Sequence, residues 1–465
     1  MGALCCKQRE EIDELQGPEL NHFHLRQIIG AGVFGRVRIV QHKRSRKKYA
    51  LKYINKSLCI RQKAIANIIS ERNLLQSINH PYIANLRFAF QDDESLFMAL
   101  DLMPGGDLRR LIQLNEQQQQ QQLQPSIFTF NELQVRHYVA TIAIALNYLH
   151  RNRVIHRDIK PENILLDDKG YAHLSDFNIA VRYNVNQPLL WSMAGTIAYM
   201  APEMVARKGY STSVDWWSLG VVAFELLFGK RPFTAPSKEA LAQSILHDPI
   251  DFPENVHQIV SRDCLDVLVG LLDKSSFPRL GANIHGFEEF KRHPWFDGLD
   301  WELLEQKRLP PPVRLDKNAK LRKAITEQQQ QLFHEDGLKS NKRVSPSMTL
   351  LHFDDSETVP VTEEARLHLQ LEEQFLSYDF QRPDNQYLLP GKISPIYSTN
   401  DQQQPETTIT SNVAMMEQRE SHFLANFLEQ RRNSLKRQYD KFKRRSQSSY
   451  QDLPNSTLPS STTVD

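Results

Sequence analysis

One stretch limits the possible folds of this chain more than any other, the segment from His156 to Asn178. It begins His156-Arg157-Asp158-Ile159-Lys160-Pro161-Glu162-Asn163 and ends Ser175-Asp176-Phe177-Asn178. Two short apolar runs lie between these ends, around a turn at Gly170, and this pattern predicts a β-hairpin. A hairpin returns both ends to one place. The converging carboxylates, lysine and amide would suit phosphoryl transfer, which needs a base, a cation and oxygen ligands for magnesium. The alternative is a polar loop beside a hairpin.

Composition sets broad limits on the kind of protein. The chain has 465 residues, of which 40% are hydrophobic and 24% charged, and this suits a soluble globular protein of two or three domains. Its net charge of +2 argues against a bulk nucleic-acid binder. We expect no membrane span and no secretory signal, because the sequence has no suitable apolar run. Four cysteines do not make a disulfide framework, so we expect a cytoplasmic protein.

The N-terminal segment, residues 1–22, is a candidate lipid anchor. Gly2 can accept myristate once Met1 is removed, although the usual pattern has Ser or Thr where this chain has Cys6. Cys5 and Cys6 are candidates for palmitate, and a second acyl chain would strengthen a marginal myristoyl contact. The protein would then be tethered to the cytoplasmic face of the plasma membrane. The alternative is a disordered N-terminal segment whose cysteines have no role.

A glycine-rich motif follows the first predicted strand. It reads Gly30-Ala31-Gly32-Val33-Phe34-Gly35, with Val37 two residues later and strands predicted on both sides. A dinucleotide-binding turn would open a helix, so this motif predicts a hairpin lid over phosphates instead. Glycines there let the backbone approach the phosphates closely.

A lysine and a glutamate are expected to face this lid. Tyr49-Ala50-Leu51-Lys52 predicts a short strand ending in a lysine that reaches the α- and β-phosphates. Residues 61–78 have helical spacing, and Glu71 inside them is the candidate ion-pair partner of Lys52. The alternative for Glu71 is an ordinary solvated helix residue.

The next stretch predicts a connector and a long helix. Leu96–Leu100 indicates a buried strand, and Asp101 to Gly106 a connector whose backbone, at Asp101 and Met103, would hold adenine. The six glutamines Gln117–Gln122 predict a solvated loop insert, near residues 113–124. Residues 131–150 then predict an apolar helix that supports the segment from His156 to Asn178, called the catalytic segment below.

Later parts of the chain carry further candidates. Ser192 and Thr196 lie in the segment that ends Ala201-Pro202-Glu203, and Arg279 is a candidate partner of Glu203. Residues 413–446 predict a basic amphipathic helix, which would bind anionic lipid or calmodulin. The alternative for that helix is a solvated charged surface.

Taken together, these motifs resemble eukaryotic protein kinases over residues 23–296. The resemblance implies an α+β, bilobal fold, with a small antiparallel β lobe (23–100) bearing one regulatory helix and a larger helical lobe (102–296). It implies a monomeric catalytic domain that uses ATP and Mg²⁺, with Mn²⁺ as a substitute. The lysine two residues after Asp158 is typical of serine/threonine kinases.

The resemblance also implies a role for each matching residue. Asp158 would accept the proton of the substrate hydroxyl, Lys160 would contact the transferred phosphate, and Lys52 with Glu71 would hold the α/β-phosphates. Asn163 and Asp176 would ligate magnesium. Three groups of residues complete the expected site: the adenine contacts Val37, Ala50 and Leu165; the apolar stack Leu75, Leu86, His156 and Phe177; and Arg157 as the partner of a phosphate on Ser192.

Within the kinases the chain looks like the AGC group, and within that group like the YANK subfamily (serine/threonine kinase 32). Ser192-Met193-Ala194-Gly195-Thr196 matches the AGC activation segment, and Asp176-Phe177-Asn178 stands in place of Asp-Phe-Gly. We predict that Asn178 preserves catalysis and restricts flipping of Phe177. Residues 297–381 resemble the AGC tail, although the hydrophobic-motif candidate Phe375–Phe380 has unusual spacing. Beyond the tail we expect a linker (382–412), the basic helix and a disordered end (447–465).

Substrate choice follows from three acids. Asp107, Glu162 and Glu225 match positions where basophilic AGC kinases meet Arg or Lys upstream of the phosphoacceptor, and Thr196 would help to place the substrate. The alternative is that these acids are solvated surface groups. The function expected from the whole sequence is serine/threonine phosphorylation of proteins in intracellular signalling, with no nucleic-acid partner. The alternative is a catalytically silent kinase-fold scaffold at the membrane.

Overall fold

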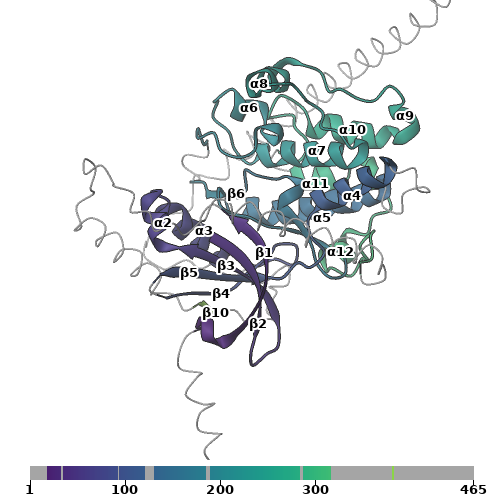
Figure 1. Ribbon diagram of the computed structural model, residues 1–465. Coiled ribbons are helices and arrows are strands. Elements are labelled where there is room, and N and C mark those ends of the chain that lie inside the picture. The colour runs from purple at the N-terminus through teal and green to yellow at the C-terminus, as the bar shows by residue number, and fades with distance from the viewer. Residues whose placement is uncertain are drawn as a thin grey trace, which may run out of the picture. The chain divides into compact units, whose positions relative to one another are not determined.

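The computed structural model describes residues 18–32, 35–92, 94–120, 130–184, 189–282, 286–315 and 380–381. Within this part of the chain a mainly β lobe precedes a mainly helical lobe, as predicted (Figure 1). No helix among these residues is long and apolar enough to cross a membrane.

The small lobe is built on one antiparallel sheet with the strand order β1-β2-β3-β5-β4-β10, in which β10 is Phe380–Gln381. Its elements are the turn η1 (Leu20–His22), β1 (Phe23–Gly32), β2 (Gly35–His42), β3 (Lys48–Asn55), α2 (Lys56–Arg61), α3 (Ile65–Ser77), β4 (Leu86–Gln91) and β5 (Ser95–Asp101). Strand β5 is buried on both faces. Phe97 and Ala99 join an aromatic cluster with Phe23, whereas Leu96 and Met98 join the main core. This alternation is the period-two pattern of a strand covered on both sides.

The large lobe is centred on two buried helices, α5 (Glu132–Arg151) and α7 (Ser213–Phe228), which pack against each other. Its other helices are α4 (Leu108–Gln120), α6 (Pro202–Val205), α8 (Lys238–His247), α9 (Val256–Ile259), α10 (Arg262–Leu271), α11 (Gly286–Lys291) and α12 (Trp301–Glu305). Its short strands and turns are β6 (Val154–Ile155), η2 (Pro161–Asn163), β7 (Ile164–Leu166), β8 (Ala172–Leu174), β9 (Val181–Arg182), η3 (Ile197–Tyr199) and η4 (Pro294–Phe296).

The predicted hairpin between the two ends of the catalytic segment is confirmed. Strands β7 and β8 pair antiparallel, and Gly170 in their turn has a φ of 104°. A Cβ at Gly170 would lie 2.0 Å from the carbonyl oxygen of Val313. Only glycine fits there, because the residues after α12 run directly across the turn.

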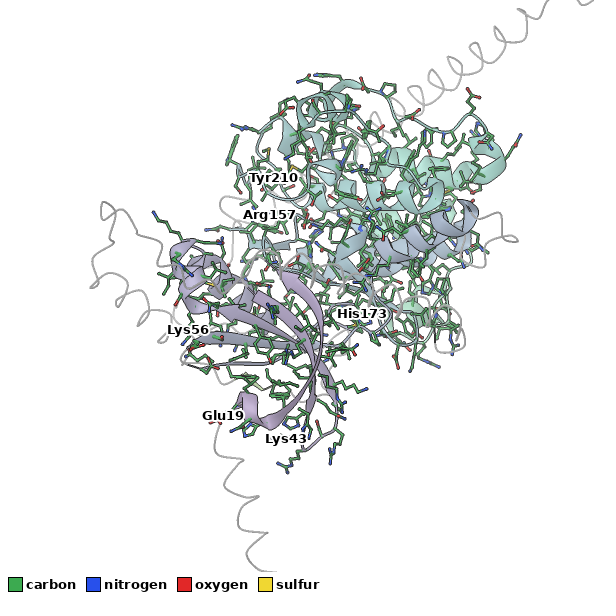
Figure 2. The ribbon with its side chains drawn as sticks, in the orientation of Figure 1. Glu19, Lys43, Lys56, Arg157, His173 and Tyr210 are labelled. Carbon is green, nitrogen blue, oxygen red and sulfur yellow. The ribbon has the colours of Figure 1, made fainter. Side chains whose placement is uncertain are left out.

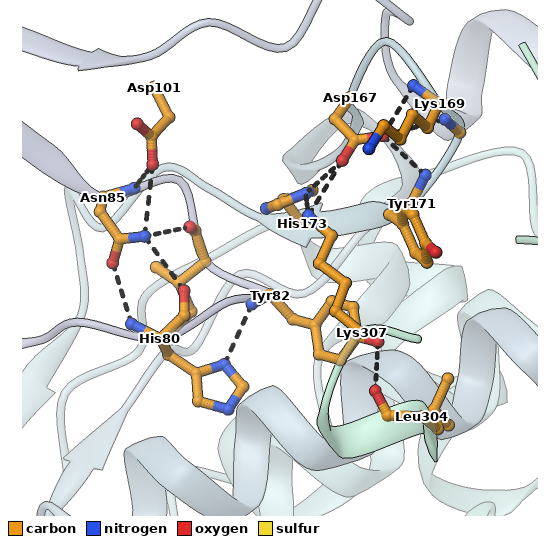
Figure 3. A network of polar contacts seen from close by, with 12 residues as sticks. His80, Tyr82, Asn85, Asp101, Asp167, Lys169, Tyr171, His173, Leu304 and Lys307 are labelled. Carbon is orange, nitrogen blue, oxygen red and sulfur yellow. Dashed lines mark hydrogen bonds and ion pairs between the residues drawn. The ribbon is translucent and has the colours of Figure 1, made fainter. Parts of the chain in front are cut away.

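A polar network joins α12 and the residues that follow it to both lobes (Figure 3). Tyr82 donates a hydrogen bond to the Leu304 carbonyl, and Lys307 Nζ lies 2.9 Å from Asp167 Oδ2 and 2.8 Å from His173 Nε2. Burial, opposed by the interaction with Asp167, lowers the pKa of Lys307. These contacts therefore hold in place the β7–β8 hairpin, which lies between Asp158 and Asp176 in the sequence.

A short strand from the end of the AGC-like tail also joins the small lobe. Strand β10 (Phe380–Gln381) pairs antiparallel with β4, with Phe380 opposite Ala89. Phe380 is the last residue of the hydrophobic-motif candidate, so this end of the candidate reaches the sheet edge despite its unusual spacing.

Two predictions about helices need correction. The helix expected over residues 61–78 is present as α3, Ile65–Ser77, but it starts later than expected. Residues 62–64, with a φ of 52° at Lys63, separate it from the preceding helix α2, which ends at Arg61. The glutamine run was expected to be a loop, yet α4 continues through Gln120. Glutamine is a good helix former, so a helix begun at Leu108 extends into the run without penalty.

Candidate active site

Asp158 is the centre of a compact set of hydrogen bonds. Its Oδ2 accepts from Lys160 Nζ at 2.6 Å and from Asn163 Nδ2 at 3.0 Å, and its Oδ1 accepts from the Thr196 hydroxyl at 2.9 Å and amide at 3.1 Å. Burial raises the pKa of Asp158, but the hydrogen bonds from Lys160 and Thr196 outweigh it and hold the pKa below its ordinary value. The carboxylate is therefore ionised and oriented, as a proton acceptor must be.

The loop that carries Asp158 is held by a residue that the sequence reasoning missed, Asp215 at the start of α7. Its carboxylate accepts the amide hydrogens of His156 (3.0 Å) and Arg157 (2.8 Å), and it contacts His150 Nε2 at 2.8 Å. Arg157 has a φ of 69°, in the left-handed region. The fully buried Asp215 stabilises this unusual backbone immediately before the catalytic carboxylate. Its position in the sequence, 57 residues after Asp158, gave no signal of the contact.

The predicted ion pair between Lys52 and Glu71 is present. Lys52 Nζ lies 2.8 Å and 3.0 Å from the two carboxylate oxygens, and Glu71 is buried in α3. Burial raises the pKa of Glu71, against the opposing effect of the Lys52 ammonium. Lys52 also donates to Asn178 Oδ1 at 2.9 Å, so a residue of the catalytic segment ties the large lobe to the small-lobe pair.

Asn178 reaches Lys52 without adopting the backbone conformation that favours asparagine or glycine. Among Asp176, Phe177 and Asn178, the residue with left-handed backbone is Asp176, with a φ of 61°. Phe177 between them is buried, and its ring centroid lies 4.9 Å from that of His156. Leu75 and Leu86 are also buried, in the same core cluster as Phe177, as expected for the apolar stack.

Asn163 and Asp176 are suited to a divalent cation. The two side-chain hydrogen bonds between Asn163 and described residues both use Nδ2, to the Asp158 carbonyl (2.8 Å) and carboxylate (3.0 Å). The side-chain oxygen, Oδ1, is therefore available as a metal ligand. Asp176 is exposed, on the short stretch that follows β8. Carboxylate and amide oxygens are ligands that Mg²⁺ accepts, with phosphate oxygens completing the shell.

The glycine-rich motif forms the turn between β1 and β2, as predicted. Gly30 lies opposite Val37, and Gly32 lies opposite Gly35, while Val33 and Phe34 lie outside the described residues. Gly35 has a packing reason to be glycine, because a Cβ there would lie 1.8 Å from the Tyr53 carbonyl oxygen.

The expected adenine contacts lie on several elements. Val37, Ala50 and Leu165 are half-buried, on β2, β3 and β7. Asp101 at the end of β5 uses its carboxylate for Arg87 (2.6 Å) and its amide for the Asn85 carbonyl (3.0 Å). Its carbonyl and the Met103 backbone are the connector groups expected from the sequence to hold adenine.

The activation-segment candidate Ser192 lies beside Arg157, as expected. Arg157 donates to the Ser192 hydroxyl at 2.9 Å and to the Tyr210 hydroxyl at 3.2 Å. The positions of Arg157 and Tyr210 are labelled in Figure 2. Tyr210, which the sequence reasoning missed, donates to the Ser192 carbonyl at 2.6 Å. A phosphate on Ser192 would meet a guanidinium already in place.

Farther from the site, the predicted pairing of Glu203 and Arg279 is confirmed. Two parallel hydrogen bonds of 2.6 Å and 2.9 Å join the side chains, and Arg279 is fully buried. Gly2, Cys5, Cys6 and the basic segment 413–446 lie outside the described residues.

The three candidate substrate acids each contact an arginine on α4. Glu162 and Glu225 both pair with Arg109, at 2.7 Å and 2.9 Å, and Asp107 pairs with Arg110 at 3.1 Å. Nothing in the sequence pointed to Arg109.

Comparison with known proteins decides the family. The protein kinase domain family matches residues 23–296, more than half of the 465 residues. The chain belongs to the protein kinase family. The region that matches also has the two lobes and the ordered motifs described above.

The curated relatives agree with the subfamily predicted from the motifs. The chain is 38% identical over 305 residues to serine/threonine-protein kinase 32B of Homo sapiens, covering 64% of this chain and 69% of that protein. It is 38% identical over 306 residues to a probable serine/threonine-protein kinase of Dictyostelium discoideum, covering 66% and 63%. It is 36% identical over 294 residues to the cAMP-dependent protein kinase catalytic subunit of Arthrobotrys oligospora, covering 63% and 53%. The prediction of an AGC-group kinase near serine/threonine kinase 32 is confirmed. The aligned region spans about half to two thirds of these relatives.

Proposed function

We propose that this protein transfers the γ-phosphate of ATP to serine and threonine hydroxyls of protein substrates. The observation that carries the proposal is the arrangement of Asp158, whose ionised carboxylate is fixed by Lys160, Asn163 and Thr196. Relatives named as serine/threonine-protein kinases support the same reaction.

In this proposal each residue has a distinct part in the transfer. Asp158 accepts the proton from the substrate hydroxyl as that oxygen forms its bond to the γ-phosphorus and the bond to the β-γ bridging oxygen breaks, releasing ADP. Lys160, 2.6 Å from Asp158, balances negative charge on the transferred phosphate. Lys52 holds the α- and β-phosphates while Glu71 fixes its position.

The site residues also fit the expected cofactors. Asn163 and Asp176 would hold Mg²⁺, or Mn²⁺ in its place, and the metal supplies neutralisation of phosphate charge. Val37, Ala50 and Leu165 would enclose adenine between the lobes.

The cellular setting is part of the proposal. Acylation at Gly2, Cys5 or Cys6 would bring a cytoplasmic kinase to the membrane, where the basic segment 413–446 would bind anionic lipid or calmodulin. Phosphorylation of Ser192 would order the activation segment through Arg157.

The experiment is transfer of labelled phosphate from ATP to an equimolar mixture of serine, threonine and tyrosine peptides. We expect magnesium-dependent labelling of the serine and threonine peptides, and none by the Asp158→Asn variant. Labelling at the same background level by both proteins would favour a silent scaffold instead.

A further inference from the structure

The acids expected to read basic substrates are already engaged by the chain itself. Arg109 places Nε 2.7 Å from Glu162 Oε1, and its Nη1 and Nη2 lie 2.9 Å and 3.1 Å from the two oxygens of Glu225. One guanidinium therefore joins both carboxylates, and it binds Glu225 through two parallel hydrogen bonds. This is the arrangement in which a substrate arginine would be held.

The surroundings of Glu225 complete the arginine site. Tyr199 donates to Glu225 Oε2 at 2.6 Å and accepts from Arg109 Nη2 at 2.5 Å. Glu225 and Tyr199 are buried, while the side chain of Arg109 is 22% exposed and that of Glu162 is 44% exposed. The guanidinium of Arg109 thus lies between the buried carboxylate of Glu225 and the exposed carboxylate of Glu162, and it is held there by charge.

The contacts of Arg109 with Glu162 and Glu225 lie close in the structure to the reaction centre. Glu162 lies on η2, next to Asn163, which donates to the Asp158 carboxylate. Arg109 lies in the first turn of α4, where the helix dipole disfavours a positive charge. Its two ion pairs outweigh this effect, so the position of Arg109 is fixed by the acids and not by helix preference.

The third acid is occupied in a similar way. Arg110 Nε lies 3.1 Å from Asp107 Oδ2, and the Arg110 amide donates to Asp107 Oδ1 at 2.9 Å. The three carboxylates therefore face two guanidinium groups, and the cluster has one uncompensated negative charge instead of three. Its attraction for a basic peptide is correspondingly reduced.

We propose that Arg109 is a specificity-determining residue that occupies, in cis, the site for a substrate arginine formed by Glu162 and Glu225. A substrate arginine must displace Arg109 to reach these acids. One bidentate contact between arginine and Glu225 then replaces another, so the net gain in binding free energy is small. The wild-type kinase is therefore nearly indifferent to arginine upstream of the phosphoacceptor. This inference rests on the proposed function, because it concerns the substrate of the same site.

The experiment measures kcat/KM for a serine peptide set in which arginine replaces alanine at each of six upstream positions in turn. For wild type we expect the arginine-to-alanine ratio to stay within about threefold at every position. For Arg109→Leu we expect the ratio to rise about ten- to a hundredfold at one position, the range for gaining a charge-assisted bidentate contact. The matched control is Arg151→Gln, which removes an exposed arginine of α5 and should leave every ratio unchanged.

Two further variants separate specificity from a structural role. In Arg109→Leu with Glu225→Gln, the gained preference for arginine should fall back toward the wild-type ratio while the alanine peptide is still phosphorylated. Arg109→Lys keeps the charge without the two-pronged contact and should give an intermediate ratio. If thermal melting shows that Arg109→Leu does not fold, Arg109→Lys tests the inference in its place.

Two results would overturn the inference. One is a wild-type kinase that already prefers arginine tenfold or more at the position concerned. The other is a folded Arg109→Leu or Arg109→Lys variant whose ratios equal those of wild type. Failure of the proposed function would give a different result: the wild-type protein would label no serine peptide above the background of the Asp158→Asn variant.

Discussion

Asn178 offers the sharpest perturbation of the site, because it replaces a glycine of the kinase motif and contacts Lys52. We predict that Asn178→Gly retains magnesium-dependent phosphate transfer with a modest loss of rate. The loss comes from one hydrogen bond, since Lys52 keeps both contacts to Glu71 when the asparagine amide is removed.

The magnitude follows from the three acceptors of Lys52. A hydrogen bond to a charged group contributes ~1.5–3 kcal/mol, and solvent competition at the exposed Asn178 reduces this to about 1 kcal/mol, or about fivefold in rate. Glu71 is buried and pairs with Lys52 through two contacts. Removing one partner of a buried ion pair costs ~3–5 kcal/mol, so Glu71→Gln should lose at least about a hundredfold.

The assay is kcat/KM for ATP with a serine peptide, for wild type, Asn178→Gly, Asn178→Ala and Glu71→Gln. Asn178→Ala removes the same hydrogen bond without the backbone freedom of glycine. A difference in kcat/KM between Asn178→Ala and Asn178→Gly therefore measures how far the backbone at residue 178 restricts flipping of Phe177. The reasoning is refuted if Asn178→Gly is as defective as Glu71→Gln, or if wild type is inactive and Asn178→Gly restores activity.

Two predictions concern stability. Glu203→Gln leaves the fully buried Arg279 without its charge partner, so unfolding should become easier by about 3 kcal/mol and Tm should fall by roughly 6–12 °C in a thermal melt; an unchanged Tm would contradict it. Burial lowers the pKa of His137 from 6.5 to about 4. Between these two pH values His137 is protonated in the unfolded chain but neutral in the native state. The free energy of unfolding therefore decreases as pH falls from 6.5 toward 4. Between pH 7.5 and pH 5, the free energy of unfolding of His137→Leu should therefore fall by about 2 kcal/mol less than that of wild type, as measured by urea denaturation. Equal decreases for the two proteins would argue against this role for His137.

The sequence was most informative where function depends on local spacing. The hairpin β7–β8, the turn at Gly170 and the order Lys52, Glu71, Asp158, Asp176 follow from short motifs, because each motif combines a turn or strand pattern with a fixed residue type. These features identified the family before any contact was known.

Contacts between distant residues were not accessible in the same way. Arg109 contacts Glu162 and Glu225, which lie 53 and 116 residues away, and nothing in the sequence around Arg109 distinguishes it from a solvated arginine. The support of the catalytic loop by Asp215 was missed for the same reason. The helical glutamines of α4 show a different limit, since composition indicated a loop where the preceding helix decides the structure.

The central claim is that Asp158 accepts the substrate proton in phosphate transfer to serine or threonine. Single-turnover transfer by wild type and Asp158→Asn, with ATP binding measured on the same proteins, tests it most directly. The account predicts that the rate falls by at least about a hundredfold, as for loss of a general base, while the Kd for ATP stays within about twofold. A variant that keeps the wild-type rate would contradict it.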